Sequence, residues 1–239
     1  MKEMWDKKAA SYPRFTGEPS VFHRGLYAKI AEFGIKFEGK SVVDIGCGTG
    51  VHTLFLAQIC REITGMDISG EMLKVMVEDA AKFNISNLTA VQSDFKSFNP
   101  NRVYDVAFST MSPAIADEED FVKFINLGEK RVYLWWNKPR YSSVLELFYE
   151  GSEKRCFKEK ANFFEEYLRR ENIAFNSCVL EESREQKRTL EEMTQNALWH
   201  LQIANFTYDE NAVRSRLESI AQDGYVTEKI VSSMKLLVF

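Results

Sequence analysis

The sequence contains few of the residues that build disulfide frames or metal sites. Among its 239 residues there are four cysteines and three histidines. The cysteines are far apart and form no Cys-x-x-Cys pair, which indicates reduced thiols and excludes a zinc site of paired cysteines. We therefore expect neither a disulfide frame nor a bound metal. The four cysteines are Cys47, Cys60, Cys156 and Cys178.

Long apolar runs and a strong excess of one charge are also missing. No apolar run approaches the roughly 20 residues of a membrane span. The first twelve residues, MKEMWDKKAASY, lack the apolar stretch of a signal peptide, so we expect a cytoplasmic protein with no membrane partner. A net charge of −4 gives no general attraction to nucleic acid. With 45% hydrophobic residues, the length suits one α/β domain with a substantial core.

The most informative stretch is SVVDIGCGTG at residues 41–50. Its β-branched residues are typical of a buried parallel strand. The strand ends in three glycines at alternate positions, Gly46, Gly48 and Gly50. Glycine allows a tight turn and a close approach of the backbone to a ligand. Residues 51–57 are predicted to form a helix, so the stretch predicts a nucleotide-type site at the first strand of a doubly wound sheet.

This motif resembles the first motif of the class I S-adenosylmethionine-dependent methyltransferases. The carrying residues are Asp-Ile-Gly-Cys-Gly-Thr-Gly, starting at Asp44. The resemblance implies S-adenosylmethionine as cofactor, with S-adenosylhomocysteine as product. It implies that the backbone of Gly46, Cys47 and Gly48 lies near the methionyl and ribose groups, with Asp44 beneath the loop. An ordinary turn in an α/β domain is the alternative.

Acidic residues follow two further predicted strands. Asp67 ends the strand at 62–67, seventeen positions after Gly50, near the offset of about 20 that places a carboxylate on ribose hydroxyls. Ile68 would then contact adenine. Asp94 and Phe95 follow the strand at 88–92, and the resemblance implies that they contact adenine too. The alternatives are a helix cap at Asp67 and a surface turn at Asp94.

The resemblance extends to two further segments that border the cofactor in this family. The segment with Trp5 and Tyr12 approximates a W-D-x-x-A-x-x-Y pattern, which would fold Tyr12 over the cofactor; simple packing of both rings is the alternative. After the strand at 103–108, Ser109 and Thr110 would face the methionyl end. The following Met-Ser-Pro-Ala lacks the Asn/Asp-Pro-Pro-Tyr/Phe motif of methyltransferases that act on adenine N6, cytosine N4 or glutamine. This difference counts against those three acceptors. We expect a small-molecule acceptor and no nucleic-acid partner.

The whole pattern predicts one α/β domain with a doubly wound, mostly parallel seven-stranded sheet. By the resemblance its strand order is 3-2-1-4-5-7-6, with the last strand antiparallel and helices on both faces. Residues 1–36 form a helical cap in this prediction, 37–136 the cofactor-binding core, and 137–239 the part with the acceptor-side helices and final strands. In the last part we expect a helix at 159–171 and strands at 174–180 and 234–239.

No catalytic base is evident in the sequence. Tyr12, Tyr141 and His200 could each reach a cleft, although a structural or surface role is the simpler interpretation of each. The region around and after the end of the fifth predicted strand, at 131–136, is aromatic. This composition fits an apolar or flat acceptor, or core packing. Its aromatic residues are Trp135, Trp136, Tyr141, Phe148 and Tyr149.

Two other function classes use a similar sheet. A nicotinamide oxidoreductase would place a small residue where Val51 stands. A non-catalytic relative would bind the cofactor, or nothing, and act on a partner protein; the intact glycine pattern with Asp67 argues for retained binding. The sequence leaves the acceptor atom and the oligomeric state open.

Overall fold

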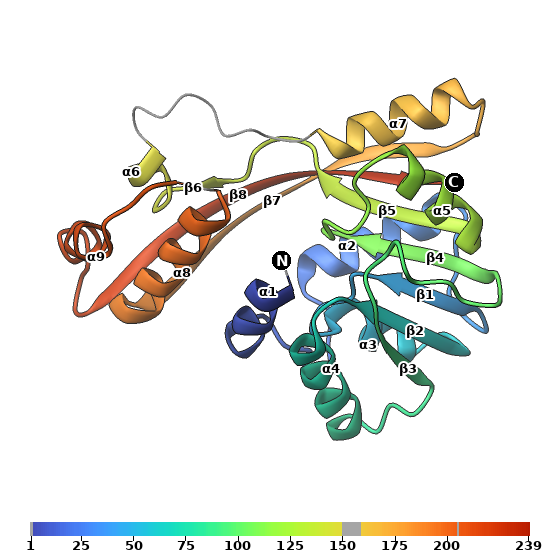
Figure 1. Cartoon of the computed structure of the whole chain (residues 1–239), viewed down its shortest axis with the longest axis horizontal. Coiled ribbons are helices and arrows are strands. Elements are labelled where there is room, and N and C mark those ends of the chain that lie inside the picture. Colours follow the sequence, from blue (N-terminus) through green and yellow to red (C-terminus); the bar gives the residue numbers. More distant parts are fainter. Residues whose placement is uncertain (1, 150–158, 205) are drawn as a thin grey trace. The chain divides into compact units, whose positions relative to one another are not determined.

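The computed structural model describes residues 2–149, 159–204 and 206–239 (Figure 1). The chain forms two compact units. The first unit comprises residues 1–135, 160–178 and 235–239, and the second comprises 136–159 and 179–234. The first unit is thus assembled from three separate stretches of sequence.

The sheet has the predicted order of a class I methyltransferase fold. Strands β1 to β5 are parallel neighbours in the order β3-β2-β1-β4-β5. β8 follows β5, and Arg131 and Phe239 exchange backbone hydrogen bonds of 2.7 and 3.1 Å, as in an antiparallel pair. β7 pairs with β8, so the predicted position of the final strand is confirmed. The strands are β1 Ser41–Ile45, β2 Glu62–Asp67, β3 Leu88–Gln92, β4 Tyr104–Thr110, β5 Gly128–Trp136, β6 Tyr141–Ser142, β7 Asn176–Thr189 and β8 Tyr225–Val238.

The C-terminal strands differ from the prediction in number and length. An eighth strand, β6, pairs antiparallel with β8 through two residues. β7 continues to Thr189, nine residues beyond its predicted end at Leu180. β8 begins at Tyr225, nine residues before its predicted start at Met234. The added part of β7 reads EESREQKRT. It contains no alternating apolar residues, so its strand structure could not be predicted from the sequence pattern.

Helices cover both faces of the sheet in the first unit. Val43 and Ile45 of β1 share a hydrophobic core with residues of α5 and α7. The alternate residue Asp44 points to the opposite face, where Thr53 of α3 donates a hydrogen bond to it. Gly128 ends α5 and starts β5. The helices of this unit are α1 Lys2–Lys8, the 3₁₀ helix η1 Ala9–Ser11, α2 Val21–Glu32, α3 Val51–Ala57, α4 Gly70–Lys82, α5 Glu118–Leu127 and α7 Lys160–Arg170.

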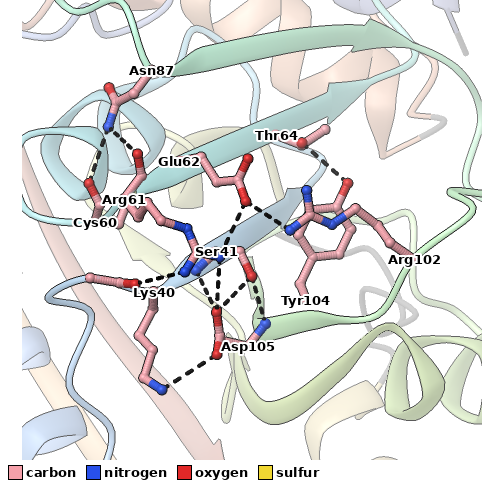
Figure 2. Close-up of polar contacts among 11 residues, drawn as sticks. Lys40, Ser41, Cys60, Arg61, Glu62, Thr64, Asn87, Arg102, Tyr104 and Asp105 are labelled. Carbon is pink, nitrogen blue, oxygen red and sulfur yellow. Dashed lines mark hydrogen bonds and ion pairs between the residues drawn. The ribbon is translucent and has the colours of Figure 1, made fainter.

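Polar contacts fix the register of the central strands at their amino ends (Figure 2). The carboxylate of Asp105 on β4 accepts hydrogen bonds from the backbone N–H and the hydroxyl of Ser41 on β1, both at 2.7 Å. The N–H of Ser41, followed by its hydroxyl, lowers the pKa of Asp105 to about 2. Nearby, Glu62 of β2 pairs with Arg102 at 2.8 Å. These contacts lie at the end of the sheet opposite to the glycine loop.

The second unit has its own small core. α6 Glu146–Tyr149, α8 Leu190–Ile203 and α9 Glu210–Glu218 pack here, with Met193, Ala197 and Leu217 fully buried. Thr189 caps α8 through a capping box with Glu192, and Asp209 caps α9 through the N–H of Ala212.

In the described part of the chain, no helix is long and apolar enough to cross a membrane. Cys47, Cys60 and Cys178 are free thiols, and Cys156 lies outside the described residues. No group of three His, Cys, Asp or Glu side chains that could hold a metal occurs among the residues described.

Candidate functional site

The glycine loop between β1 and α3 is anchored to the end of β2. The N–H groups of Gly46 and Cys47 both donate to the carbonyl of Met66, at 2.8 and 3.0 Å. All three glycines have positive φ, between +56° and +80°. A Cβ on Gly46 would lie 1.8 Å from the Ser112 hydroxyl, whereas a Cβ on Gly48 would meet only the Tyr12 ring, at 3.8 Å. The loop is therefore packed at Gly46 and presents bare backbone at Gly48.

Asp67, the predicted ribose acid, lies against this bare backbone. One carboxylate oxygen accepts the N–H of Gly48 at 2.8 Å, and the other accepts the N–H of Ser69 at 2.9 Å. Burial raises the pKa of Asp67, while the backbone donors, led by Ser69, oppose the rise. Ser69, not Asp67, caps α4, through its hydroxyl and the N–H of Met72. A carboxylate has about four acceptor positions, so Asp67 retains acceptor capacity for a ligand's hydroxyl groups.

Asp44 lies beneath the loop, as the resemblance implied. It is 2% exposed, and its carboxylate accepts the hydroxyl of Thr53 at 2.6 Å. Burial raises the pKa of Asp44 to about 7, against the Thr53 hydrogen bond. Burial likewise raises the pKa of the Cys47 thiol far above its ordinary value. Cys47 therefore contributes its backbone and a neutral thiol to this loop.

The N-terminal segment lies over the glycine loop within the first unit. The Tyr12 ring is next to Gly48, and Trp5 packs edge-on against Tyr12 with ring centroids 6.1 Å apart. The Thr49 hydroxyl donates to the carbonyl of Pro13. At the other end of the segment, Asp6 accepts the Ser69 hydroxyl at 2.6 Å. The segment is thus held on both sides of the loop, and Trp5 and Tyr12 pack against each other; that Tyr12 covers a cofactor stays a prediction.

The residues predicted for adenine have different environments. Ile68, next to Asp67, is half-buried. Asp94 is exposed and accepts the N–H of Ser97 at 2.9 Å, and its hydrogen bonds with Ser97 lower the pKa of Asp94. Phe95 is only 4% exposed and belongs to the core of the first unit. Ile68 and Asp94 remain accessible to a ligand, whereas the Phe95 ring is committed to packing.

After β4, the predicted methionyl contacts also divide. Ser109 is fully buried and its hydroxyl donates to the Ile45 carbonyl at 3.1 Å. Its side chain therefore ties β4 to β1 and does not face a ligand. Thr110 is half-buried. The next residue, Met111, has a φ of +52°, and its N–H donates to the Leu134 carbonyl at 2.8 Å.

Two of the candidate bases and several of the predicted aromatic residues lie in the second unit. Tyr141 is 44% exposed on β6, and His200 of α8 lies with Nε2 3.5 Å from a guanidinium nitrogen of Arg140. Phe148 and Tyr149 pack against the core of this unit. Phe148 also lines a cavity of about 360 Å³. The other residues around this cavity are Leu147, Leu201, Phe206, Thr207, Tyr208, Asp209, Ala212, Val213 and Arg216.

Sequence analysis did not identify several residues around the loop. Ser112 fills the space beside Gly46, and Thr53 binds Asp44. His52, the second residue of α3, lies with Nδ1 2.8 Å from the Tyr27 hydroxyl. Burial lowers the pKa of His52 to about 3, so its imidazole is neutral at physiological pH. Of these residues, only Thr53 could have been found from the sequence, because it lies nine positions after Asp44 on the first turn of the predicted helix.

The geometry agrees with a comparison against protein families. Residues 42–127 match the family model described as "Methyltransferase domain". The chain carries a methyltransferase domain. The matched region contains β1 to β4, the glycine loop and Asp67. All of it belongs to the first unit.

Curated relatives match the methyltransferase domain over part of their length. An uncharacterized protein of Haemophilus influenzae is 28% identical over 54% of this chain and 48% of its own. Pavine N-methyltransferase of Thalictrum flavum is 32% identical over 38% of this chain and 26% of its own. Ribosomal RNA small subunit methyltransferase A of Mesomycoplasma hyopneumoniae is 26% identical over 61% of this chain and 64% of its own. The chain thus spans about half or less of the first two relatives.

Solved structures share the fold at low sequence identity. The YcgJ protein of Bacillus subtilis has a TM-score of 0.56 at 13% identity, covering 90% of this chain and 98% of its own. A methyltransferase of Thiobacillus denitrificans in complex with S-adenosyl-L-homocysteine has a TM-score of 0.51 at 13% identity, covering 98% of both chains. The [4+2]-cyclase SpnF has a TM-score of 0.53 at 14% identity, covering 97% of this chain and 94% of its own. The fold therefore accommodates more than one chemistry.

Proposed function

We propose that this chain transfers a methyl group from S-adenosylmethionine to a small-molecule acceptor. The observation that carries the proposal is Asp67, held by the N–H groups of Gly48 and Ser69 at the carboxyl end of β2. A carboxylate in this position suits the vicinal hydroxyls of an adenosyl ribose. The absence of side-chain atoms at Gly48 leaves room for the cofactor on the same side of the loop.

The residues of the first unit fit this cofactor. Asp67 would accept the ribose hydroxyls, the backbone of Gly46 to Gly48 would approach the ribose and methionyl groups, and Asp94 with Ile68 would border adenine. Tyr12 would cover the loop from the side of the N-terminal segment. Thr110, which is half-buried, remains the proposed contact at the methionyl end.

When bound, the cofactor supplies an electrophilic methyl group on a sulfonium and a neutral thioether as leaving group. The protein's main contribution is then to orient the acceptor nucleophile in line with that methyl group and to exclude water. A general base is needed only for an acceptor that is protonated at the working pH. We assign no residue to this role.

A small-molecule acceptor is supported by the relationship to pavine N-methyltransferase. The relationship to a ribosomal RNA methyltransferase favours a nucleic-acid acceptor instead. The net charge of −4 and the segment Thr-Met-Ser-Pro-Ala after β4 support the first alternative. We place recognition of the acceptor in residues 137–239, cofactor binding in 37–136 and the cap in 1–36, and we propose a cytoplasmic location.

Calorimetric titration of the purified chain with S-adenosylmethionine, S-adenosylhomocysteine and NAD tests the proposal. We expect about micromolar binding of both sulfur compounds, equivalent to about −8 kcal/mol, and no binding of NAD. Binding of NAD alone would replace the proposal with an oxidoreductase. If the sulfur compounds bind, small amines and a ribosomal RNA fragment should then be compared as acceptors, with transfer of a labelled methyl group as the measurement.

A further inference from the structure

Lys160, the first residue of α7, is buried although it carries a charge. The residue is only 7% exposed. Its Nζ donates to the backbone carbonyls of Pro113 and Ile115, at 3.1 and 3.3 Å, and lies 4.8 Å from the centroid of the Trp135 ring. A lysine ammonium is rarely buried, because its desolvation must be offset by hydrogen bonds or by an aromatic face. Lys160 therefore has a defined structural task at this position.

The two carbonyls belong to the loop after β4, which lies against the glycine loop. The Ser112 hydroxyl occupies the space where a side chain on Gly46 would lie. It also accepts the N–H of Ala114 at 3.2 Å. Lys160 therefore holds the carbonyls on either side of Ala114 in a loop that contacts the candidate cofactor site through Ser112.

We propose that Lys160 is a positioning residue, which fixes the loop of residues 111–115 in the conformation that cofactor binding requires. The proposal depends on the proposed function, since it assumes that the glycine loop binds an adenosyl cofactor. The ammonium is suited to this task because it can donate to several carbonyls from a single point at the end of a flexible chain. Once the donor is lost, the two carbonyls are released and Ser112 is no longer held against Gly46.

Lys160→Met tests the proposal, because it keeps an unbranched side chain and removes the charge and the donors. Lys235→Met is the matched control. Lys235 pairs with Glu165 of the same helix α7 and donates to Asn162 at 2.6 Å, and both of these partners lie outside the loop after β4. The measurements are calorimetric affinity for S-adenosylhomocysteine well below the melting temperature, thermal unfolding, and hydrogen exchange of the amides of residues 111, 112 and 114–116 without ligand.

We expect Lys160→Met to bind S-adenosylhomocysteine about tenfold more weakly, and its loop amides to exchange at least about tenfold faster. Lys235→Met should lower the melting temperature and leave the affinity and loop exchange unchanged. Wild-type affinity and unchanged exchange in Lys160→Met would overturn the proposal, and so would equal effects in both variants. If Lys160→Met does not fold, Lys160→Gln replaces it under the same criteria.

The failure of the proposed function gives a different result. In that case the wild-type protein itself does not bind S-adenosylhomocysteine. The exchange measurement on unliganded protein then still decides whether Lys160 fixes the loop. Normal exchange in Lys160→Met would refute even this structural part of the inference.

Discussion

Asp67→Ala removes the carboxylate that connects the glycine loop with the candidate ribose site. The Asp67 carboxylate would accept hydrogen bonds from two ribose hydroxyls. Hydrogen bonds to a charged group each contribute about 1.5–3 kcal/mol to the free energy of binding. The loss of two such bonds corresponds to a decrease in affinity for S-adenosylhomocysteine of at least about a hundredfold. The N–H of Gly48, which Asp67 holds at 2.8 Å, would also be released and would loosen the loop.

The same substitution should have only a small effect on stability. Asp67 is 9% exposed, and burial raises its pKa, which means that the folded state does not favour the ionised carboxylate. Its removal relieves this unfavourable burial and at the same time frees two backbone N–H groups. We therefore expect a net loss of about 1 kcal/mol, or a few degrees in melting temperature.

Asp105→Ala is the matched control, because this aspartate also accepts a backbone N–H and lies at the opposite end of the sheet (Figure 2). The hydrogen bonds from Ser41 lower the pKa of Asp105 to about 2. The folded state thus binds its proton less tightly than the unfolded state, whose pKa is near 3.8. Asp105 therefore contributes about 2 kcal/mol to the free energy of unfolding above pH 4, and this contribution is lost as the pH falls towards 2.

Calorimetry and urea unfolding of both variants at pH 7.5 would check this reasoning. We expect Asp67→Ala to lose binding with little loss of stability, and Asp105→Ala to lose about 2 kcal/mol of stability with unchanged affinity. Unchanged affinity in Asp67→Ala would show that the site assignment is wrong. Loss of affinity in both variants would show that the effect is general destabilisation and not removal of a ligand contact.

Two further predictions concern the same loop. Gly50→Ala should lower the free energy of unfolding by about 2–4 kcal/mol, because φ is +80° and the new Cβ would lie 2.3 Å from Met76 Cγ. Gly34→Ala, with φ of +86° and no atom within 4 Å of the added Cβ, should lose only about 1 kcal/mol by urea unfolding. In the folded state the pKa of Asp44 is raised to about 7. Its contribution to the free energy of unfolding is therefore largest below its ordinary pKa of 3.8, and it falls as the pH rises to 7. The stability of Asp44→Asn relative to wild type should thus rise by about 2–3 kcal/mol between pH 5 and pH 8, and a flat difference would contradict the raised pKa.

The parallel half of the fold could be predicted because its central strands, β1 and β4, are largely buried. β1 has all five residues buried, and three of them, Val42, Val43 and Ile45, are β-branched and apolar. β7 and β8 follow other rules over much of their length. Residues 181–189 are all charged or polar, and their strand structure depends on pairing between β7 and β8, which the periodicity of the sequence does not reveal.

The candidate site was predictable where the backbone conformation requires a particular residue. Gly46, Gly48 and Gly50 all have positive φ, and such a requirement leaves a trace in the sequence. Side-chain direction leaves no such trace at the end of a strand. Ser109 and Phe95 were therefore predicted as ligand contacts by position, although their side chains lie in the interior.

Lys160 illustrates the limit of sequence analysis most clearly. Its acceptors are backbone carbonyls 47 and 45 positions away, at Pro113 and Ile115. Because every residue has a carbonyl, neither acceptor has a residue type that could reveal the contact. In the sequence, Lys160 is one more charged residue at the start of an amphipathic helix. Positions that act through backbone acceptors can therefore be found only from the fold, and they must be tested by substitutions such as Lys160→Met.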